Sequence, residues 1–304
     1  MLQEKEFDET LVKCTVMDDR KEENMKQNGK LYLCATPIGN LEDITLRVLR
    51  TLREVDLIAA EDTRNSIKLL NHFDIKTPMT SYHEYNKVEK AYTLIEKMQE
   101  GLNVALITDA GTPGISDPGE VLAAMCYDAG IEVTSLPGPA ACITALTLSG
   151  LSTRRFAFEA FLPPDKKERK AILEELKNET RTMIFYEAPH KLHACLRDMY
   201  AAWGDRRIAV VHELTKIHEE VIRTTLKAAA ARYSEGNIKG EFVLVIEGAK
   251  PEELQEGYTL EQAVEIAAGL MREQGMSASE AAKTASQQTG LKKGDIYKGA
   301  LALK

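Results

Sequence analysis

The segment VALITDAGTPGISDPG (residues 104–119) runs from a short aliphatic stretch directly into a turn rich in glycine and proline. Two further segments share this design, LYLCATPIGN (31–40) and EVTSLPGPAA (132–141). A strand that ends in such a turn and leads into a helix exposes backbone N–H and C=O groups at the carboxyl edge of a sheet, where open α/β sheets bind small ligands. Three such turns favour a ligand site, although the residues alone leave open that they are only tight turns.

Strand and helix patterns alternate around these turns. Strands are expected at 31–36, 56–61, 79–83, 103–109 and 131–136, and helices near 44–54, 64–73, 86–100, 118–129 and 139–149. Alternation with short connections is typical of a parallel sheet covered on both faces. We therefore predict an α/β domain over residues 30–150.

A second α/β domain is predicted over residues 151–250. Its strands are expected at 155–162, 181–187, 207–213, 219–226 and 241–247, and its helices near 166–178, 190–201 and 226–234. The strands at 207–213 and 219–226 are close enough in sequence to form a hairpin, so this sheet is predicted to be mixed.

The two ends of the chain differ from the α/β domains. Residues 1–29 are rich in Glu, Asp and Lys without a hydrophobic period, and we expect a flexible leader there. Residues 257–304 carry three short helical patterns and no strand, which indicates a small helical module of helix-turn-helix size. Capping boxes are predicted at two of its helix starts, Thr259 with Gln262 and Ser277 with Glu280.

The composition is that of an ordinary globular protein with an acidic balance. The 304 residues carry a formal net charge of −8, which counts against non-specific coating of nucleic acid through many phosphate contacts. A local basic stretch at 154–170 has six Lys or Arg residues against three acidic ones, and it is either a solvated helix face or a phosphate-binding surface. No apolar run reaches the ~18 residues of a membrane span. We expect a cytoplasmic protein with no membrane partner.

Neither metal nor polyphosphate chemistry is indicated. The five cysteines are scattered without CxxC spacing, and His190 and His193 lack an obvious third ligand, so we expect no metal. Gly111, Gly114 and Gly119 match neither the dinucleotide nor the Walker pattern. Because the turns lack lysine, they suit a ligand with a sulfonium and a carboxylate better than a polyphosphate.

Polar side chains follow several of the predicted strands. Asp62 either caps the following helix or, with Glu61 and Arg64, binds a polar substrate. His83 is either a proton acceptor or a structural histidine. The segments 186–190 and 213–216 end strands of the second domain, so both sheets are expected to present their carboxyl edges to one shared cleft.

Several segments together resemble the bacterial small-subunit ribosomal RNA cytidine-2′-O-methyltransferases, a branch of the tetrapyrrole (corrin/porphyrin) methylase superfamily. They are ATPIGNLEDITLRVLRTLREVDLIAAEDTR (35–64), TDAGTPGISDPG (108–119), LPGPAA (136–141), FYEAPHKL (185–192), ELTK (213–216), GEFVLVIEG (240–248) and the helical tail at 277–303. The resemblance begins near Lys30, so Met25 is expected to be the natural start. Asn65 departs from some members and receives no role.

The resemblance implies a homodimeric, two-domain methyltransferase that binds S-adenosyl-L-methionine in the cleft between its α/β domains. The substrate would be the ribose of a cytidine in the decoding region of 16S ribosomal RNA within the small ribosomal subunit. The helical module would bind RNA. Carried over by motif, the cofactor-binding residues would be Pro37, Gly39, Asp109, Ala110, Gly111, Thr112, Ile115, Ser116, Pro137, Gly138, Ala140, Tyr186, Ala188 and Leu214.

The polar groups around the ribose and its phosphate are expected to be Asp62, Arg64, His83, Asn86, Glu187 and Lys216. The sequence does not rank Asp62, His83 and Glu187 as general base. Two alternative functions stay open. A tetrapyrrole C-methyltransferase of the same superfamily would need a broad apolar trough for a macrocycle, and a non-catalytic ribosome-assembly factor would bind RNA through the tail.

Overall fold

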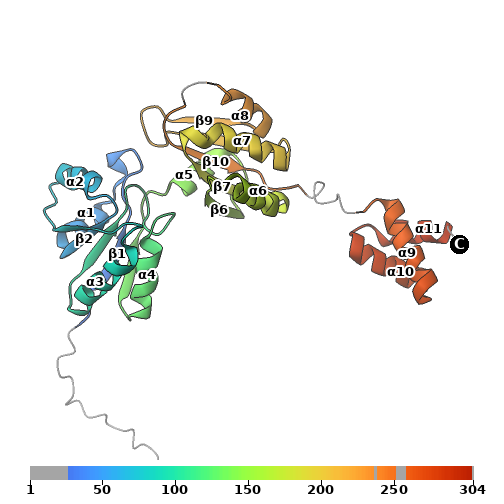
Figure 1. The fold of residues 1–304 in the computed structure, drawn as a ribbon, viewed down its shortest axis with the longest axis horizontal. Helices are drawn as coiled ribbons and strands as arrows, with labels where there is room; N and C mark the ends of the chain where they lie inside the picture. Colours follow the sequence, from blue (N-terminus) through green and yellow to red (C-terminus); the bar gives the residue numbers. More distant parts are fainter. Residues whose placement is uncertain (1–26, 236–237, 251–257, 303–304) are drawn as a thin grey trace, which may run out of the picture. The chain divides into compact units, whose positions relative to one another are not determined.

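The computed structural model describes residues 27–235, 238–250 and 258–302 (Figure 1). The chain forms two compact units. Unit 1 holds the chain up to Thr36 together with Ile44–Gly138, and unit 2 holds Pro37–Asp43 and the chain from Pro139 onward. The predicted leader falls almost wholly on residues outside the described ranges, as do Cys14 and the expected start at Met25.

Unit 1 is built around a five-stranded parallel sheet with strand order β3-β2-β4-β1-β5. Its strands overlap all five predicted ranges, and the predicted parallel sheet is confirmed. They are β1 (Lys30–Cys34), β2 (Leu57–Ala60), β3 (Met79–Ser81), β4 (Val104–Ile107) and β5 (Glu132–Leu136). The connecting helices are η1 (Leu41–Asp43, in unit 2), α1 (Leu46–Glu54), α2 (Thr63–His72), α3 (Lys87–Gln99) and α4 (Gly119–Asp128).

Hydrophobic side chains of the sheet of unit 1 pack on both of its faces. Leu31, Ala59 and Leu106 pack with Leu94 of α3 and Leu122 of α4. Neighbouring residues of the same strands point the other way and form a second cluster with α1 and α2, which includes Val48, Leu52, Ile58, Leu70 and Ala105. Because both faces are covered, the middle strands of this sheet present backbone polar groups to a ligand at their ends.

Unit 2 contains a mixed five-stranded sheet with strand order β6-β7-β10-β8-β9. Strands β6 and β7 are parallel and the other pairs are antiparallel, so the predicted mixed sheet and its β8–β9 hairpin are confirmed. The strands are β6 (Phe156–Phe161), β7 (Thr182–Glu187), β8 (Arg207–His212), β9 (Glu220–Thr225) and β10 (Phe242–Ile246). The helices are α5 (Ala141–Ser149), α6 (Lys166–Glu175), η2 (Leu176–Asn178), α7 (Pro189–Trp203) and α8 (Leu226–Arg232).

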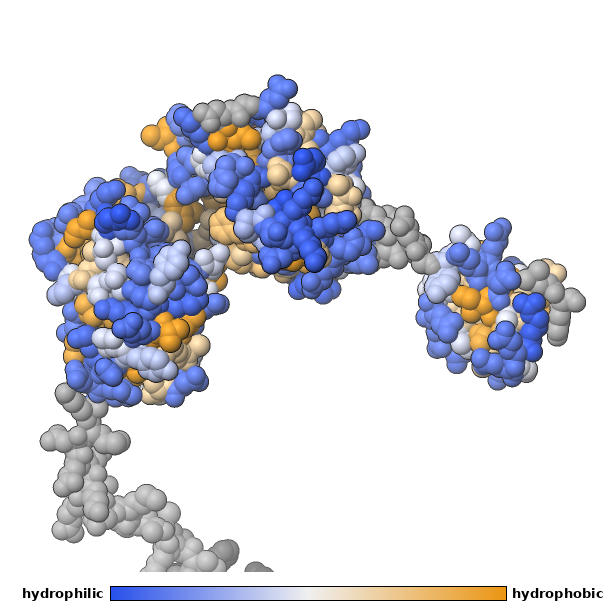
Figure 2. Space-filling model, viewed as in Figure 1, coloured by the Kyte–Doolittle hydropathy of each residue, from blue (hydrophilic) through white to orange (hydrophobic). Residues whose placement is uncertain are grey.

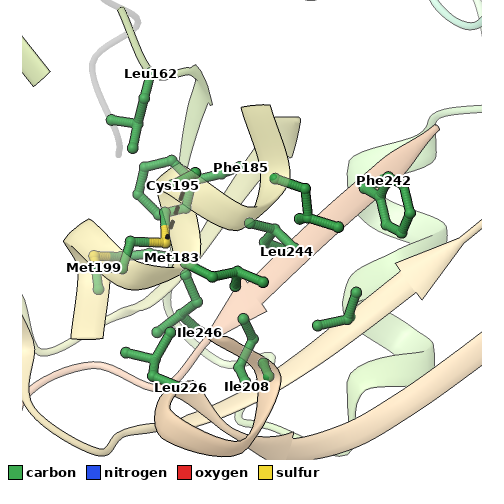
Figure 3. Close-up of a cluster of buried hydrophobic side chains, with 14 of the residues drawn as sticks. Leu162, Met183, Phe185, Cys195, Met199, Ile208, Leu226, Phe242, Leu244 and Ile246 are labelled. Carbon is green, nitrogen blue, oxygen red and sulfur yellow. Dashed lines mark hydrogen bonds between the residues drawn. The ribbon is translucent and has the colours of Figure 1, made fainter. Parts of the chain in front are cut away.

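Alternate residues of β7 divide between the two faces of this sheet. Met183 and Phe185 enter the larger core under α6, α7 and α8, where Figure 3 shows side chains from β7, β10 and α7 meeting one another. Ile184 and Tyr186 face the opposite side, which α5 covers through Cys142 and its neighbours. Four cysteines, Cys34, Cys126, Cys142 and Cys195, are buried and form no disulfide.

Helix α5 belongs to unit 2, whereas the sequence placed residues 139–149 at the end of the first domain. Ala145 and Leu146 pack against Ile184, Val211 and other residues of the second sheet. The division between the units therefore falls at 138/139 rather than near 150/151. The sequence does not reveal this because α5 is mostly apolar, apart from Thr144, Thr147 and Ser149, and fits the face of either sheet.

The C-terminal module consists of α9 (Leu260–Gln274), α10 (Ala278–Thr289) and α11 (Lys293–Ala302). Alanines dominate its small core, together with Ile296. Both predicted capping boxes are present, and Gly290 ends α10 with a left-handed conformation, φ 72°. Among the described residues, no helix is long and apolar enough to cross a membrane. On the visible face of the molecule hydrophobic residues lie in small separate patches (Figure 2).

Candidate functional site

Hydrogen bonds tie together three neighbouring strand ends at the carboxyl edge of unit 1. The Glu61 carboxylate, just after β2, accepts hydrogen bonds from Thr108 Oγ1 (2.6 Å) and the Asp109 backbone N–H (3.3 Å), just after β4. Thr36, after β1, donates from Oγ1 to the Thr108 carbonyl at 3.1 Å and exchanges backbone hydrogen bonds with Gly111. These hydrogen bonds fix, from both sides, the start of the loop at residues 109–119, which we call the glycine-rich loop.

Asp117 holds the rest of this loop. Its carboxylate accepts hydrogen bonds from the backbone N–H groups of Gly114 (2.9 Å), Ile115 (3.2 Å) and Gly119 (2.8 Å). Burial raises the pKa of Asp117, and the three donors oppose that shift. The backbone folds around the carboxylate with positive φ at Gly114 (86°) and also at Ser116 (67°), which is uncommon for a residue with a side chain. Asp117 was not predicted as a site residue, although an aspartate beside glycines is typical of such a turn.

Asp62 and Arg64 form one tight pair at the start of α2. The Asp62 carboxylate caps the helix by accepting from the Arg64 N–H at 2.8 Å, and it also accepts from the Arg64 guanidinium at 2.8 and 3.1 Å. These hydrogen bonds lower the pKa of Asp62 to about 2. A carboxylate so strongly stabilised in its charged form is a poor proton acceptor.

His83 lies after β3, beside the buried Tyr82. Its backbone N–H donates to Asn86 Oδ1 at 2.8 Å, and Tyr82 Oη donates to the Pro118 carbonyl at 3.0 Å. The Nδ1 atom of the His83 ring is buried and, within the ranges the structure describes, has no hydrogen-bond partner. A buried imidazole nitrogen without a partner is costly, so this atom is suited to a group that arrives with a ligand.

Asp109 is the third acidic group at this edge. Burial raises its pKa, and the neighbouring charges of Glu61 and Asp62 add to the shift. The Asn65 side chain donates to the Asp109 carboxylate, which gives a structural role to a residue that the sequence left without one. In the turn after β5, a Cβ on Gly138 would lie 2.6 Å from the Cβ of Ala35, so this turn requires glycine.

In unit 2 the PIGN loop packs against the turn after β8. A Cβ on Gly39 would lie 2.6 Å from Lys216 Cγ and 3.0 Å from the Leu214 carbonyl oxygen, so the two segments pack too closely for a side chain at position 39. Leu214 is buried in the core beneath α5, together with the partly buried Ile38. Three residues predicted to bind cofactor, Pro37, Gly39 and Leu214, are therefore brought close together.

Two carboxylates hold Lys216 in place. Lys216 Nζ lies 2.8 Å from Glu213 Oε1 and 2.9 Å from Glu241 Oε2. Burial acts to lower the pKa of Lys216, but these two hydrogen bonds raise it overall, so Lys216 stays a cation. The turn is strained, with positive φ at Glu213 (52°) and Thr215 (66°). Glu213 and Glu241 were not predicted as site residues, and a pairing across 25 positions has no sequence signal.

The end of β7 places Tyr186 and Glu187 on opposite faces. Tyr186 Oη accepts a hydrogen bond from the Cys142 N–H at the start of α5 (3.1 Å). Glu187 is buried, with only 4% of its surface exposed, and accepts from the Ala188 N–H at 2.8 Å. Burial and the Glu187 charge raise the pKa of the Cys195 thiol well above its ordinary value, so this cysteine is not an activated nucleophile.

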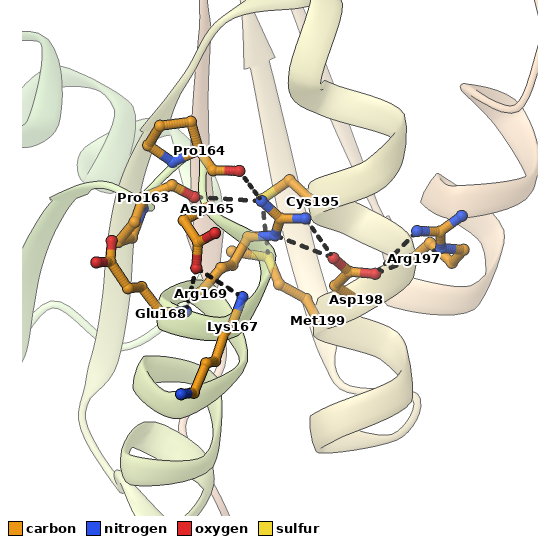
Figure 4. A network of polar contacts seen from close by, with 10 residues as sticks. All are labelled: Pro163, Pro164, Asp165, Lys167, Glu168, Arg169, Cys195, Arg197, Asp198 and Met199. Carbon is orange, nitrogen blue, oxygen red and sulfur yellow. Dashed lines mark hydrogen bonds and ion pairs between the residues drawn. The ribbon is translucent and has the colours of Figure 1, made fainter.

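The basic stretch at 154–170 is only partly available for a ligand. The Arg169 guanidinium bonds Asp198 Oδ2 at 2.9 and 3.0 Å and the carbonyl oxygens of Pro163 and Pro164 (Figure 4). Asp165 caps α6 through the N–H groups of Lys167 and Glu168. The remaining basic side chains are exposed, namely Arg154, Arg155, Lys166, Lys167 and Lys170.

Two cavities that lie within single units are lined by none of the residues predicted to bind cofactor. One of about 200 Å³ lies beside Glu187 and His190 and is smaller than typical ligand pockets. Another of about 350 Å³ lies near Asn103 and Val55, at the opposite edge of the sheet of unit 1. Among the described residues, no group of three or more His, Cys, Asp or Glu side chains is placed to hold a metal ion.

Within each unit the predicted residues gather at the strand ends. In unit 1 these are Asp62 with Arg64, His83 with Asn86, and the loop from Asp109 to Ser116. In unit 2 they are the loops around Gly39 and Lys216, and Tyr186 and Glu187 at the end of β7, which β10 separates from β8. The arrangement gives unit 1 a loop of fixed backbone shape and unit 2 an ammonium group held between two carboxylates.

Comparison with known proteins identifies the family. Residues 30–230 match the family model of the tetrapyrrole (corrin/porphyrin) methylases. A protein of Synechocystis sp. named ribosomal RNA small subunit methyltransferase I is 48% identical over 276 residues, covering 90% of this chain and 98% of its own length. The protein of the same name from Escherichia coli O157:H7 is 45% identical, covering 90% of this chain and 95% of its own length.

A solved structure supports the fold. Uroporphyrin-III C-methyltransferase from Thermus thermophilus, in complex with S-adenosylhomocysteine, superposes with a TM-score of 0.52 at 18% identity, covering 71% of this chain and 97% of its own. The resemblance seen in the sequence is therefore confirmed. The chain belongs to the tetrapyrrole methylase family and, within it, to the methyltransferases named ribosomal RNA small subunit methyltransferase I.

Proposed function

We propose that this protein transfers a methyl group from S-adenosyl-L-methionine to the ribose 2′-hydroxyl of a cytidine in the decoding region of 16S ribosomal RNA. The observation that carries the proposal is the identity of 45–48% along nearly the whole length of relatives named for methylation of small-subunit ribosomal RNA. That similarity includes the C-terminal module region, because it covers 90% of the chain.

The glycine-rich loop of unit 1 fits the proposed cofactor. Asp117 and Glu61 fix the loop from the inside, so the backbone between Asp109 and Ser116 is preorganised for a ligand. The loop carries no lysine, in keeping with a sulfonium ligand rather than a polyphosphate. We assign to S-adenosylmethionine the residues predicted from the motifs, with Pro37, Gly39, Leu214, Tyr186 and Ala188 contributing from unit 2.

The cofactor supplies a methyl group that is already activated on a sulfonium. The residues of the chain then have to align the attacking oxygen with that carbon, exclude water and accept the hydroxyl proton. Of the three candidate bases, Asp62 is held ionised by Arg64, and Glu187 accepts from Ala188. We therefore assign proton acceptance to His83, whose buried Nδ1 has no partner within the described ranges.

The remaining polar residues bind and orient the substrate in this proposal. Asn86 orients His83 through the His83 backbone. Arg64, which is paired with Asp62, and Lys216, which is paired with Glu213 and Glu241, offer their remaining N–H donors to the ribose and its phosphate. Glu187, buried at the end of β7, is the remaining polar residue of this predicted set. We further propose that the protein is cytoplasmic and forms a homodimer, and light scattering of the purified protein will test the homodimer.

The decisive assay is methyl transfer from radiolabelled S-adenosylmethionine to small ribosomal subunits from cells that lack this gene. The proposal predicts label on one cytidine of the small-subunit RNA after nuclease mapping. Absence of transfer with intact cofactor binding would refute it. Transfer to a tetrapyrrole would then favour the C-methyltransferase alternative, and cofactor binding without turnover on any substrate would favour an assembly factor.

A further inference from the structure

The C-terminal module distributes its charges unevenly between its helices. Helix α9 carries three glutamates and one arginine, Glu261, Glu265, Glu273 and Arg272. The segment of α10 and α11 carries four exposed lysines, Lys283, Lys292, Lys293 and Lys298. It has two acidic residues, and Glu280 is engaged in the capping box with Ser277. The module is therefore acidic along α9 and basic along α10 and α11.

One stripe of α11 faces away from the module core. Ile296 and Ala300 are buried, and Gly299 lies against α9, where an added Cβ would come within van der Waals overlap of Val264. These residues fix which side of the helix points outward. The opposite side presents Gly294, Tyr297, Lys298 and Leu301, at the i, i+3, i+4 and i+7 spacing of a single helix face.

The exposed stripe combines the kinds of side chain that RNA-binding surfaces use. Tyr297 is 37% exposed and Leu301 is 43% exposed, so an aromatic ring and an aliphatic side chain are open to a partner beside Lys298. Gly294 adds no side chain, and nothing lies within 4 Å of the place a Cβ would take, so the backbone there is open to close approach. Lysines bind phosphates, and exposed aromatic rings stack on unpaired bases.

We infer that the exposed face of α11, formed by Gly294, Tyr297, Lys298 and Leu301 with Lys292 and Lys293 at its start, is the surface through which this module binds RNA. The inference deepens the proposed function and rests on it for the identity of the RNA. It resolves how an acidic protein holds a polyanion, because the contact is concentrated on one helix rather than spread over the chain.

The test uses the full-length protein and an RNA fragment that covers the small-subunit decoding region, with affinity measured at several salt concentrations. Lys298→Gln should weaken binding several-fold and reduce the slope of log affinity against log salt by about 0.7–0.9, the value of one phosphate contact. Tyr297→Ala should weaken binding by ~10-fold, and Tyr297→Phe should restore it because stacking needs only the ring.

Arg272→Gln is the matched control, because it removes one positive charge from the same module but from α9. It should leave both affinity and slope near the wild-type values. The inference is overturned if Arg272→Gln weakens binding as much as Lys298→Gln does. It is also overturned if Tyr297→Ala binds normally while thermal unfolding matches the wild type.

The outcome separates this inference from the proposed function. If the wild-type protein transfers no methyl group to ribosomal subunits while Lys298→Gln still weakens RNA binding, the α11 surface stands and the reaction assignment fails. If methyl transfer is observed and Lys298→Gln and Tyr297→Ala both bind normally, the reaction stands and the α11 surface fails. Cofactor affinity should be unchanged in all these variants.

Discussion

The carboxyl edges of the two sheets are stabilised in different ways. In unit 1, the carboxylates of Glu61 and Asp117 accept hydrogen bonds from the backbone of the glycine-rich loop. In unit 2, the turn after β8 is held by the ion pairs of Lys216 with Glu213 and Glu241. The first arrangement shapes a backbone surface, and the second fixes a charge.

This difference assigns different tasks to the two edges. The charged groups around Lys216 pair with one another, so that edge is suited to positioning. In unit 1 the imidazole nitrogen His83 Nδ1 has no partner among the described residues, and in the turn of unit 2 the same holds for Thr215 Oγ1, but a hydroxyl is a far weaker base than an imidazole. We therefore place proton transfer in unit 1, and the following predictions test this division.

The largest effect is expected from His83→Gln. Loss of a positioned base should lower kcat by ~10²–10⁴-fold while the dissociation constant for S-adenosylmethionine stays near the wild-type value. Steady-state methyl transfer and calorimetry measure the two quantities. His72→Gln, which changes an exposed histidine of α2, should be close to wild type. A normal kcat for His83→Gln would move proton acceptance elsewhere.

Asp117→Ala should weaken cofactor binding by about 10- to 100-fold, because hydrogen bonds to a charged acceptor contribute about 1.5–3 kcal/mol and three backbone donors lose theirs together. Asp117→Asn retains one acceptor oxygen, so its affinity for the cofactor should lie between those of the wild type and Asp117→Ala. Calorimetric titration with S-adenosylmethionine gives the affinities. Glu120→Ala, an exposed carboxylate on α4, is the control. Equal affinities for Asp117→Ala and the control would show that the loop keeps its shape without Asp117.

Lys216→Met should destabilise the protein by about 1–2 kcal/mol at neutral pH, because the charges of Glu213 and Glu241 are left without their cation. The hydrogen bond from Lys216 lowers the pKa of Glu213, so the ion pair contributes fully above the ordinary glutamate pKa of about 4.3 and is lost as the pH falls through the lowered value.

Denaturant unfolding of the wild type and Lys216→Met at several pH values tests this pH dependence of the free energy of unfolding. The wild type and the variant should differ at pH 7 and converge as the pH falls through the lowered pKa of Glu213. Lys170→Met removes an exposed lysine of α6 and should change little. A difference that persists unchanged at low pH would contradict an electrostatic role for Lys216.

The smallest effect is expected from Asp62→Asn. The pKa of Asp62, lowered to about 2 by Arg64, lies below the ordinary aspartate value of about 3.9, so Asp62 is ionised throughout the working range. The acid limb of the pH–rate profile should therefore be unchanged, and stability should change little because Asn is also a favourable N-cap residue. A shifted acid limb would show that Asp62 takes part in accepting the proton.

The sequence predicted the two sheets and the helical module because these depend on local patterns. Strand–turn–helix alternation and capping boxes are visible within a few residues, and they place Asp62 and His83 at strand ends. The membership of α5 was not predictable, since an apolar helix fits either sheet. Contacts between distant segments, such as Lys216 with Glu241 and Asn65 with Asp109, have no local pattern. The sequence predicted a cofactor loop at 109–116. It did not predict that Glu61 holds this loop, because that contact joins distant segments, and it missed Asp117 although an aspartate beside glycines is a local turn signal.

The central claim is that the chain methylates a ribose oxygen of small-subunit ribosomal RNA. The most direct test is mass spectrometry of nucleosides from small subunits that lack the modification and have been incubated with the purified protein and S-adenosylmethionine. The account predicts one new cytidine derivative whose added methyl group stays with the sugar on fragmentation and forms ~10²–10⁴-fold more slowly with His83→Gln. A methyl group that stays with the base, or an unmodified RNA, would contradict it.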